Sequence, residues 1–427
     1  MEDNSTNSPP HAAGVPARLI RFMLTATLLV ALLHTYIGVR LVPDLPGSTA
    51  VTVAAIVALI ASTLLIPFGM LARFVIARQP LSDRVSWAGL LAMGYFSSLL
   101  VLTALRDVVL LLARLIEWLS NADPLALLLI PSAVAVPLLA ALVTLIGFVN
   151  ARCTPRILDV EVPIRNLPTP LVDFTIVQLS DIHVGSTIKR DYVQAIVERV
   201  NSLDADLIAI TGDVVDGTVE RLAPHTAPLA DLVSRHGTFF VTGNHEYYSG
   251  AEEWVAEFER LGMRVLANSH VVLEHDGVSL VIAGVNDFTA HLFNPAWRSD
   301  PQMALAGSPV GAPKILLAHQ PRSASAAATA GFDLQLSGHT HGGQFWPWNY
   351  FVRLQQPYTA GLHRLDKLWV YTSRGTGYWG PPKRFGAPSE ITRIRLVLDP
   401  TTLGGQRSFC GANDHGAEKR ASSPSFR

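Results

Sequence analysis

The chain has 427 residues, of which 49% are hydrophobic and 16% charged, and its formal net charge is −1. This length allows two or three domains. A net charge so close to zero gives no electrostatic reason to expect a nucleic-acid partner. The sequence has 2 cysteines, Cys153 and Cys410, too few for a disulfide scaffold or a cysteine-based zinc site.

The first third of the chain is apolar. Residues 1–16 are polar and proline-rich and predict a disordered tail. A helical domain at 17–150 follows, with apolar segments at about 19–39, 49–71, 86–105 and 125–149. Each segment has about the 20 residues that a helix needs to cross the hydrocarbon core, and a cleaved signal peptide would not be followed by three more. We predict a bundle of about four transmembrane helices. Buried helices of a large soluble domain are the alternative.

Two charges interrupt the third apolar segment. Arg106 and Asp107 follow Leu105, and the apolar pattern then continues to Trp118. We predict a span that ends near Leu105, followed by an interfacial helix that ends at Trp118. A longer span that buries both charges would cost several kcal/mol unless they pair or face other protein.

Arginines are distributed unequally between the two sides of the predicted bundle. With four spans, the N-terminal tail, the second loop and everything after Val149 share one side. That side carries Arg18, Arg21, Arg73, Arg78, Arg84, Arg152 and Arg156, whereas the other carries Arg40, Arg106 and Arg114. Because basic residues concentrate on the cytoplasmic side, we expect a multi-pass cell-membrane protein with a cytoplasmic C-terminal domain.

Strand and helix patterns alternate after Arg156. Apolar, β-rich runs occur at 174–180, 206–211, 237–242, 279–284, 314–318, 333–337, 368–373 and 390–398, and helical patterns occur at 189–203 and 252–262. This order predicts an α/β domain over 151–400, with its functional site at the carboxyl ends of the strands. Residues 401–427 are polar and predict a disordered C-terminal tail.

Polar side chains follow five of these strands directly. They are Asp181, His183, Asp213, Asn244, His245, His319, His339 and His341, the last two within the glycine-rich sequence SGHTHGGQ. Carboxylate, amide and imidazole groups together suit one or two divalent ions. Taken singly, Asp181 could cap a helix, His319 could be a core histidine and Asn244 a turn residue. Five strand ends with the same kind of side chain favour a metal centre.

The blocks "DIH", "GDVVD", "GNHE", "AH" and "GHTH", between Phe174 and Gln344, resemble the signature of calcineurin-like metallophosphoesterases. The resemblance implies a four-layer α/β/β/α sandwich with a dinuclear metal centre between the sheets. By that pattern Asp181, His183 and His341 hold the first ion, Asp213 bridges, and Asn244, His319 and His339 hold the second. Ligands of these types accept manganese, iron or zinc without selecting among them.

The resemblance also implies a mechanism. Two cations would generate a hydroxide that attacks phosphorus. His245 would protonate the leaving group and Asp216 would orient His245, whereas Glu246 is assigned a structural role. Gly217 stands where protein serine/threonine phosphatases have a phosphate-gripping arginine, which argues against that subclass.

We therefore expect a membrane-anchored, metal-dependent phosphoesterase that favours phosphodiesters. The SGHTHGGQ block and residues 371–396 are similar to bacterial membrane-associated phosphoesterases that cleave UDP-2,3-diacylglucosamine, and the spans resemble transmembrane proteins with a metallophosphoesterase domain. The partners are then the lipid bilayer and a phosphate ester, with a lipid-linked ester preferred over a soluble nucleotide. A non-catalytic metal-binding scaffold and a regulatory domain of a transporter or receptor are the alternatives.

Aromatic and basic residues cluster near the predicted site. Phe345, Trp346, Trp348, Tyr350, Phe351, Tyr378 and Trp379 could form an apolar lip for a lipid tail or the bilayer surface, or they could pack within ordinary loops. Arg374, Lys383 and Arg384 could attract phosphate or anionic lipid, or they could be solvated surface charges.

Overall fold

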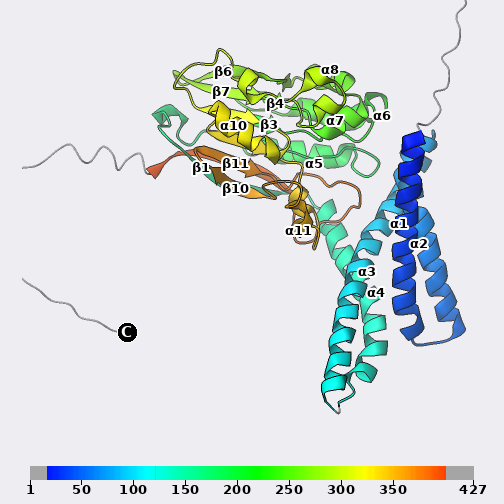
Figure 1. Ribbon diagram of the computed structural model, residues 1–427. Coiled ribbons are helices and arrows are strands. Elements are labelled where there is room, and N and C mark those ends of the chain that lie inside the picture. The colour runs from blue at the N-terminus through cyan, green and yellow to red at the C-terminus, as the bar shows by residue number, and fades with distance from the viewer. Residues whose placement is uncertain (1–16, 121, 401–427) are drawn as a thin grey trace, which may run out of the picture.

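The computed structural model describes residues 17–120 and 122–400, so the predicted tails at 1–16 and 401–427 lie outside the described residues. Four long helices precede an α/β domain (Figure 1). They are α1 (Ala17–Leu41), α2 (Thr49–Val75), α3 (Gln79–Leu119) and α4 (Pro124–Arg152).

Helix α3 is continuous, so the predicted break near Leu105 and the separate helix ending at Trp118 are wrong. The reason is that both interrupting charges find partners on other helices. Arg106 forms a 2.5 Å ion pair with Asp44 and donates a 2.8 Å hydrogen bond to the Ser132 hydroxyl. Asp107 accepts hydrogen bonds from Arg40 and from Tyr36 at 2.9 and 2.8 Å. With these partners in place, burial of Arg106 does not interrupt the helix.

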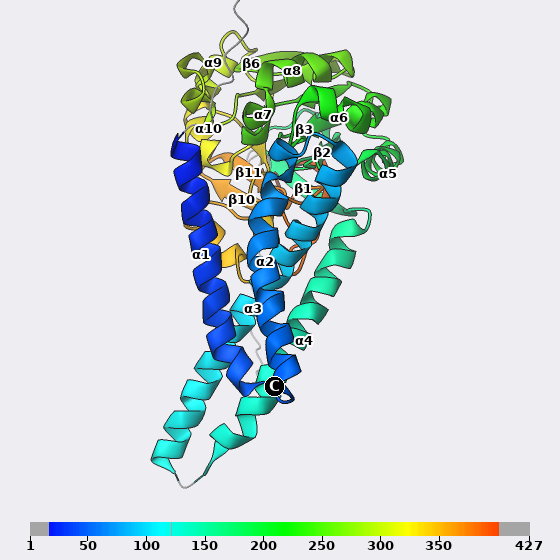
Figure 2. The ribbon, with the colours of Figure 1, turned by 90° about the vertical axis from the view of Figure 1, so that its right-hand side faces the viewer.

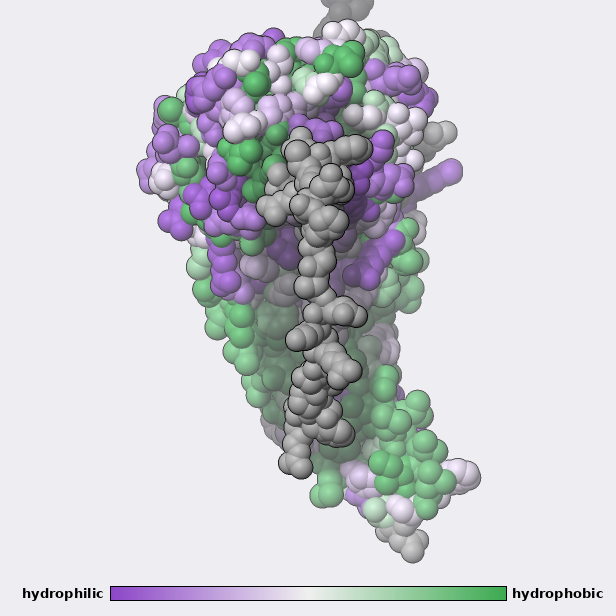
Figure 3. Space-filling view, turned by 90° about the vertical axis from the view of Figure 1, so that its left-hand side faces the viewer, coloured by the Kyte–Doolittle hydropathy of each residue, from purple (hydrophilic) through white to green (hydrophobic). Residues whose placement is uncertain are grey.

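Three of the four helices are long and apolar enough, by length and composition, to cross a membrane. Among the described residues these segments are Leu24–Asp44, Thr49–Arg73 and Pro124–Arg152. Apolar residues dominate the surface of the helices, whereas polar residues cover the α/β domain above them (Figure 3). Such an apolar exterior is expected of helices that face lipid rather than water.

The α/β domain contains two six-stranded sheets. In order across the sheet, the first contains β1 (Arg156–Ile164), β12 (Glu390–Leu398), β2 (Thr175–Leu179), β3 (Leu207–Ile210), β4 (Thr238–Phe240) and β5 (Arg264–Val265). The second contains β10 (Gly361–Leu365), β11 (Leu368–Thr372), β9 (Leu334–Ser337), β8 (Lys314–Leu317), β7 (Val278–Gly284) and β6 (Ser269–His275). Neighbours β2, β3 and β4 are parallel, as are β7, β8, β9 and β11.

The predicted alternation of strands and helices is confirmed, and three hydrophobic clusters hold the domain together. Successive strand residues point to opposite faces, so Ile176 packs in a cluster shared by both sheets, whereas its neighbour Val177 packs against helices. Helices α5 (Arg190–Asn201), α6 (Val219–Thr226) and α8 (Ala251–Arg260) contribute to that second cluster. The outer face of the second sheet packs against α9 (Pro301–Ala304) and α10 (Ala324–Ala330). Two short helices, α7 (Asn244–Ser249) and α11 (Asn349–Val352), complete the domain.

Residues 383–384 dock the α/β domain onto α3 and α4. The Lys383 ammonium donates hydrogen bonds to the Gly94 carbonyl, at 2.9 Å, and to the Ser98 hydroxyl of α3. The Arg384 backbone N–H donates to the Gly147 carbonyl of α4 at 2.8 Å. Both side chains are buried. The expectation that these two residues face phosphate, lipid or solvent is therefore wrong.

Candidate metal centre

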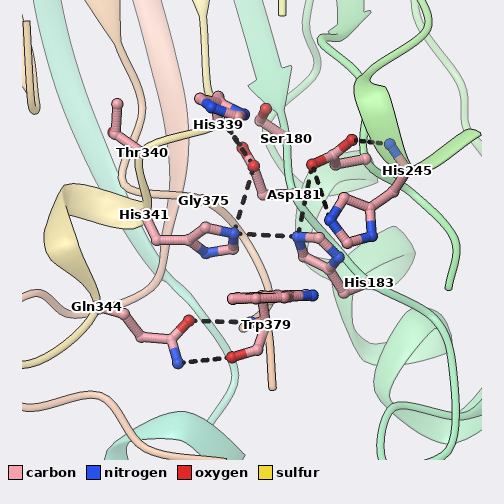
Figure 4. A network of polar contacts seen from close by, with 12 residues as sticks. Ser180, Asp181, His183, His245, His339, Thr340, His341, Gln344, Gly375 and Trp379 are labelled. Carbon is pink, nitrogen blue, oxygen red and sulfur yellow. Dashed lines mark hydrogen bonds and ion pairs between the residues drawn. The ribbon is translucent and has the colours of Figure 1, made fainter. Parts of the chain in front are cut away.

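The structure brings all the predicted site residues to one edge of the two sheets. Asp181, Asp213 and Asn244 follow β2, β3 and β4, whereas His319 and His339 follow β8 and β9. Three overlapping groups could each hold a divalent ion. They are Asp181 with His183 and His341, Asp213 with His319 and His339, and His183 with Asp213 and His245. In Figure 4 the side chains of Asp181, His183 and His341 point toward one another.

The distances between these side chains fit ligands of a common ion. Two ligands with bonds of about 2.1 Å to one ion lie about 3.0–3.4 Å apart at tetrahedral or right-angled geometry. His183 Nε2 lies 3.0 Å from His341 Nε2, which lies 3.4 Å from Asp181 Oδ1. In the second group, His319 Nε2 lies 3.2 Å from His339 Nδ1 and 3.1 Å from Asp213 Oδ2. The residues therefore fit a pair of cations.

Hydrogen-bond partners behind the histidine rings fix which ring nitrogen faces the centre. His319 Nδ1 donates to the Thr211 carbonyl at 2.8 Å, and His183 Nδ1 lies 3.2 Å from an Asp216 carboxylate oxygen. In its neutral form, each ring would therefore carry its proton on Nδ1 and present the Nε2 lone pair inward. The side-chain amide of Gln356 satisfies its neighbours when its oxygen faces the surrounding donors. In that orientation the oxygen accepts a 3.2 Å hydrogen bond from His339 Nε2, which leaves His339 Nδ1 to face the centre.

The Asn244 side chain has a buried amide oxygen with no hydrogen-bond partner among the described residues. A buried, unpaired acceptor is costly unless something else satisfies it. An ion beside His319 and His339 would do so, because amide oxygens are common ligands of hard cations. The unpaired oxygen of Asn244 therefore fits a metal ion bound at the strand ends.

The electrostatics of the site favour the ligand-competent forms of Asp213 and His339. Burial alone would raise the pKa of Asp213, but the neighbouring charges of His319, His245 and His183 hold the pKa of this carboxyl well below its usual range. Burial and the charge of His319 lower the pKa of His339 to about 3. The metal-facing carboxylate is therefore ionised and this imidazole neutral, which are the forms that bind cations.

Five of the candidate ligands adopt left-handed backbone conformations. The φ angles are +54° at Asp181, +56° at His183, +53° at Asp213, +69° at His339 and +52° at His341. Such angles are unfavourable for residues with a Cβ atom, and they concentrate where function requires them. Asp181, Asp213 and His339 turn the chain within three residues of a strand end, which directs each side chain across the sheet edge toward its neighbours.

Glu246 ties together the loops that carry the ligands. Its buried carboxylate accepts hydrogen bonds from the backbone N–H groups of Gly243, Asp213 and Val214, at 2.7, 2.9 and 2.8 Å. These bonds fasten the loop after β3 to the start of α7, which begins at Asn244. The arrangement matches the structural role expected for Glu246.

His245 and Asp216 form a pair beside the candidate ligands. His245 Nδ1 lies 2.5 Å from Asp216 Oδ1, so the imidazole turns its Nε2 atom toward Asp213, at 4.0 Å. Burial alone would lower the pKa of His245, but the carboxylates of Asp213 and Asp216 raise it to about 9. A cavity of about 410 Å³ opens at this pair, and both halves of the chain line it, including Arg73 of α2 and Tyr248 of α7.

Comparisons with known proteins agree with this geometry. Residues 174–343 match the family model of calcineurin-like phosphoesterases. A metallophosphoesterase of Aquifex aeolicus (strain VF5) is 32% identical over 226 residues, which cover 52% of this chain and 85% of the relative. This chain belongs to the calcineurin-like metallophosphoesterase family. The resemblance that the sequence blocks carried is therefore confirmed.

Two other relatives extend the comparison. A zebrafish (Danio rerio) protein named transmembrane protein with metallophosphoesterase domain is 39% identical over 267 residues, which cover 61% of each chain. A metallophosphoesterase of Helicobacter pylori (strain J99) is 40% identical over 253 residues, which cover 59% of this chain and 66% of the relative. The match thus spans less than two thirds of the length of these relatives.

The motif blocks did not reveal every residue around the metallophosphoesterase site. Arg384 is fully buried and donates to the His341 carbonyl at 2.9 Å, and its Nη2 atom lies 3.0 Å from His341 Nδ1. Arg73 of α2 donates to the Asp216 carbonyl at 3.0 Å. Neither belongs to a motif block, and no local pattern in the sequence connects these residues to the site.

Proposed function

We propose that this chain is a metal-dependent phosphoesterase that hydrolyses phosphodiesters at the membrane surface. One observation carries the proposal. Seven side chains of ligand type converge from five strand ends, and in the groups that contain His341 and His319 neighbouring donor atoms have the spacing expected around one ion. Membership of the metallophosphoesterase family supports the same chemistry.

In this proposal two ions bind. Asp181, His183 and His341 hold the first, and Asn244, His319 and His339 hold the second. Asp213 bridges, which is supported by its Oδ2 atom lying 3.1 Å from His319 Nε2 and 3.9 Å from His183 Nε2. Manganese, iron or zinc bound there would lower the pKa of a water and neutralise phosphate oxygens.

The protein's own groups would handle the leaving group. Asp216 holds His245 Nδ1, so that the Nε2 proton faces the site and can pass to the departing alkoxide. The half-exposed Trp379 ring lies 5.8 Å from the His245 ring, in an edge-to-face arrangement. Asp216 acts as a positioning residue, because it contacts the imidazole rather than the substrate.

A diester is favoured over a monoester on charge. A phosphodiester carries one negative charge, whereas a phosphomonoester carries nearly two at neutral pH and benefits from an additional cation. Gly217 follows Asp216 where an arginine would supply that cation in the protein phosphatases. Within the phosphodiester class, a lipid-linked substrate is our preferred hypothesis because the helices tether the site to a bilayer, and a soluble nucleotide is the alternative.

The membrane arrangement is part of the proposal. All four helices insert, with α3 shielded partly by its neighbours, and a four-layer α/β/β/α domain lies in the cytoplasm. This orientation is supported by the arginines at the domain side of the helices, including Arg73, Arg78, Arg84 and Arg152. The rival roles, a non-catalytic scaffold or a regulatory domain of a transporter, would tolerate loss of ligands or of His245, and the chain retains them all.

Hydrolysis by the full chain in detergent tests the proposal. The protein is stripped with a chelator, resupplied with manganese, and assayed with bis-p-nitrophenyl phosphate and p-nitrophenyl phosphate, beside the variants Asp213→Asn and His245→Ala. We expect manganese-dependent turnover of the diester that both variants lose. Turnover of the monoester alone would refute the diesterase assignment. No turnover of either ester by the manganese-loaded protein would favour the scaffold.

A further inference from the structure

An exposed apolar surface surrounds α11, directly after the glycine-rich histidine block. We call it the α11 surface, and it consists of Trp346, Trp348, Tyr350, Phe351 and Leu354. Leu354 is 85% exposed and Tyr350 is 62% exposed. Five large apolar side chains within nine residues are more than a water-facing loop of a soluble domain usually presents, and such clusters mark sites of interaction.

The α11 surface lies against the apolar helices. Trp348 donates its indole N–H to the Ser97 hydroxyl of α3 at 2.9 Å, and α11 lies beside α3 (Figure 1). Nearby, the buried Lys383 ammonium bonds the Gly94 carbonyl of the same helix and lies 4.9 Å from the Phe345 ring. The α11 surface is therefore fixed at one position along the axis of α3, near Gly94 and Ser97, and is not carried on a free loop.

Measured along α4, this position corresponds to one side of a bilayer. Arg384 contacts α4 at Gly147. The helix from Pro124 to Gly147 is about 35 Å long at about 1.5 Å per residue, close to the roughly 30 Å of a hydrocarbon core. Exposed apolar side chains line this stretch, namely Leu127, Ile130, Leu138, Leu139, Leu142, Leu145 and Ile146. If α4 crosses the bilayer, its contact with the α/β domain lies at the interface between hydrocarbon and headgroups.

We propose that the α11 surface is seated in the lipid headgroup region and so holds the metal centre beside the bilayer. Tryptophan and tyrosine are the residues that favour this region, because their rings are apolar and their N–H or O–H groups remain hydrated. A bilayer is favoured over a protein partner because the surface adjoins α3, which packs against α2 and α4, two helices that are apolar enough to span the membrane.

A pair of hydrogen bonds joins Gln344, two residues before the α11 surface, to Trp379 beside the metal centre. Gln344, the last residue of the histidine block, accepts from the Trp379 N–H at 2.9 Å and donates to the Trp379 carbonyl at 2.8 Å. Figure 4 shows these two hydrogen bonds beside His183 and His341. Trp379 is 49% exposed and its ring lies 5.8 Å from that of His245, beside the site. A phosphoester anchored by an acyl chain would then reach the centre without leaving the bilayer, a step that rests on the proposed function.

Fluorescence of the full chain in phosphatidylcholine nanodiscs tests the seating without any substrate. In a Cys153→Ser, Cys410→Ser background, an environment-sensitive label is placed at Leu354→Cys. Met303→Cys serves as the matched control, since it is an exposed apolar residue on α9, at the end of the domain away from the helices (Figure 2).

We expect blue-shifted emission and quenching by lipids brominated near the ester groups at position 354 only. Equal emission and quenching at both positions would overturn the seating. A blue shift at 354 that the brominated lipids do not quench and that grows with protein concentration would assign the surface to self-association instead, and would also overturn it.

A second measurement distinguishes an effect of the α11 surface on access to lipid-borne substrate from an effect on hydrolysis itself. The triple variant Tyr350→Ser, Phe351→Ser, Leu354→Ser is compared with wild type on soluble bis-p-nitrophenyl phosphate and on hexadecyl p-nitrophenyl phosphate in phosphatidylcholine vesicles. We expect loss of turnover of the vesicle-borne ester and retention of the soluble one. Equal loss of both, or loss of neither, would contradict the proposal. If wild type hydrolyses neither ester, the proposed function fails, and the nanodisc labels still decide the seating.

Discussion

Replacing Gly338 by alanine tests whether the glycine before the paired histidines makes room for the Asp181 carboxylate. A Cβ atom at Gly338 would lie 1.9 Å from Ser180 Oγ and 2.1 Å from Asp181 Oδ2. The backbone cannot move aside freely, because the Gly338 N–H donates to the His319 carbonyl at 2.9 Å and the Gly338 carbonyl accepts from Thr340 at 2.8 Å. The two buried side chains must therefore yield.

The size of the effect follows from these distances. Non-bonded carbon atoms approach to about 3.5 Å, so Ser180 and Asp181 must shift by more than about 1 Å. Overpacking of this kind costs about 1–3 kcal/mol of the free energy of unfolding. Metal ligands tolerate displacements of only about 0.2 Å, so we expect Gly338→Ala to bind the first ion at least about 10- to 100-fold more weakly.

Two measurements on Gly338→Ala test these expectations, namely its affinity for manganese and its thermal unfolding. Bound metal is measured after equilibrium dialysis, and thermal unfolding of the chelator-treated protein gives the packing cost. Gly307→Ala is the control, since no atom lies within 4 Å of its Cβ position and it carries only the strain of a +82° φ angle. Wild-type metal affinity and wild-type diester turnover in Gly338→Ala would refute the steric reasoning.

Three other substitutions probe the supports of the site. Glu246→Gln should lower the free energy of unfolding by about 1–3 kcal/mol, measured by denaturant titration, because an amide cannot accept from all three backbone N–H groups. Arg384→Met should weaken manganese binding by about 10- to 100-fold, measured by activity against manganese concentration, because it frees the His341 ring and backbone. Burial lowers the pKa of Lys383 to about 8, against 10.5 in the unfolded chain, so the native state releases this proton first. The melting temperature of wild type relative to Lys383→Met should therefore rise as pH increases between 8 and 10.5.

Each of these expectations has a contrary result. Unchanged stability of Glu246→Gln would mean that water replaces the lost acceptor. Loss of activity in Arg384→Met that no manganese concentration restores would mean that Arg384 contributes more than support of a metal ligand. Parallel melting curves of wild type and Lys383→Met across the pH range would mean that Lys383 is hydrated in the folded protein.

Local patterns predicted the elements that form the core of the α/β domain, because buried strands need unbroken apolar residues whatever their neighbours are. They did not predict β1, β5, β6 or β10. The burial of β1 and β6 alternates or is partial, and β5 has only two residues. The continuity of α3 was also outside the reach of local patterns. It depends on Asp44 and Ser132, which reach Arg106 from other helices.

The candidate ligands were predictable because parallel strands end at a common edge, so that polar residues after each strand must meet. Their supports were not. Thr211, Gln356 and Arg384 contact His319, His339 and His341 only through the packing of separate segments. Arg384 also illustrates the limit of reading charge from sequence, because a basic residue near a phosphate site proves to be a buried anchor between the histidine and α4.

The most direct test of the account is a titration of the stripped full chain with manganese, in which bound ions and bis-p-nitrophenyl phosphate turnover are measured on the same samples. The account predicts that turnover appears only as the second ion binds and that Asp213→Asn loses both high-affinity binding and turnover. Full turnover with one ion, or unchanged turnover in Asp213→Asn, would contradict a centre in which this carboxylate joins two ions.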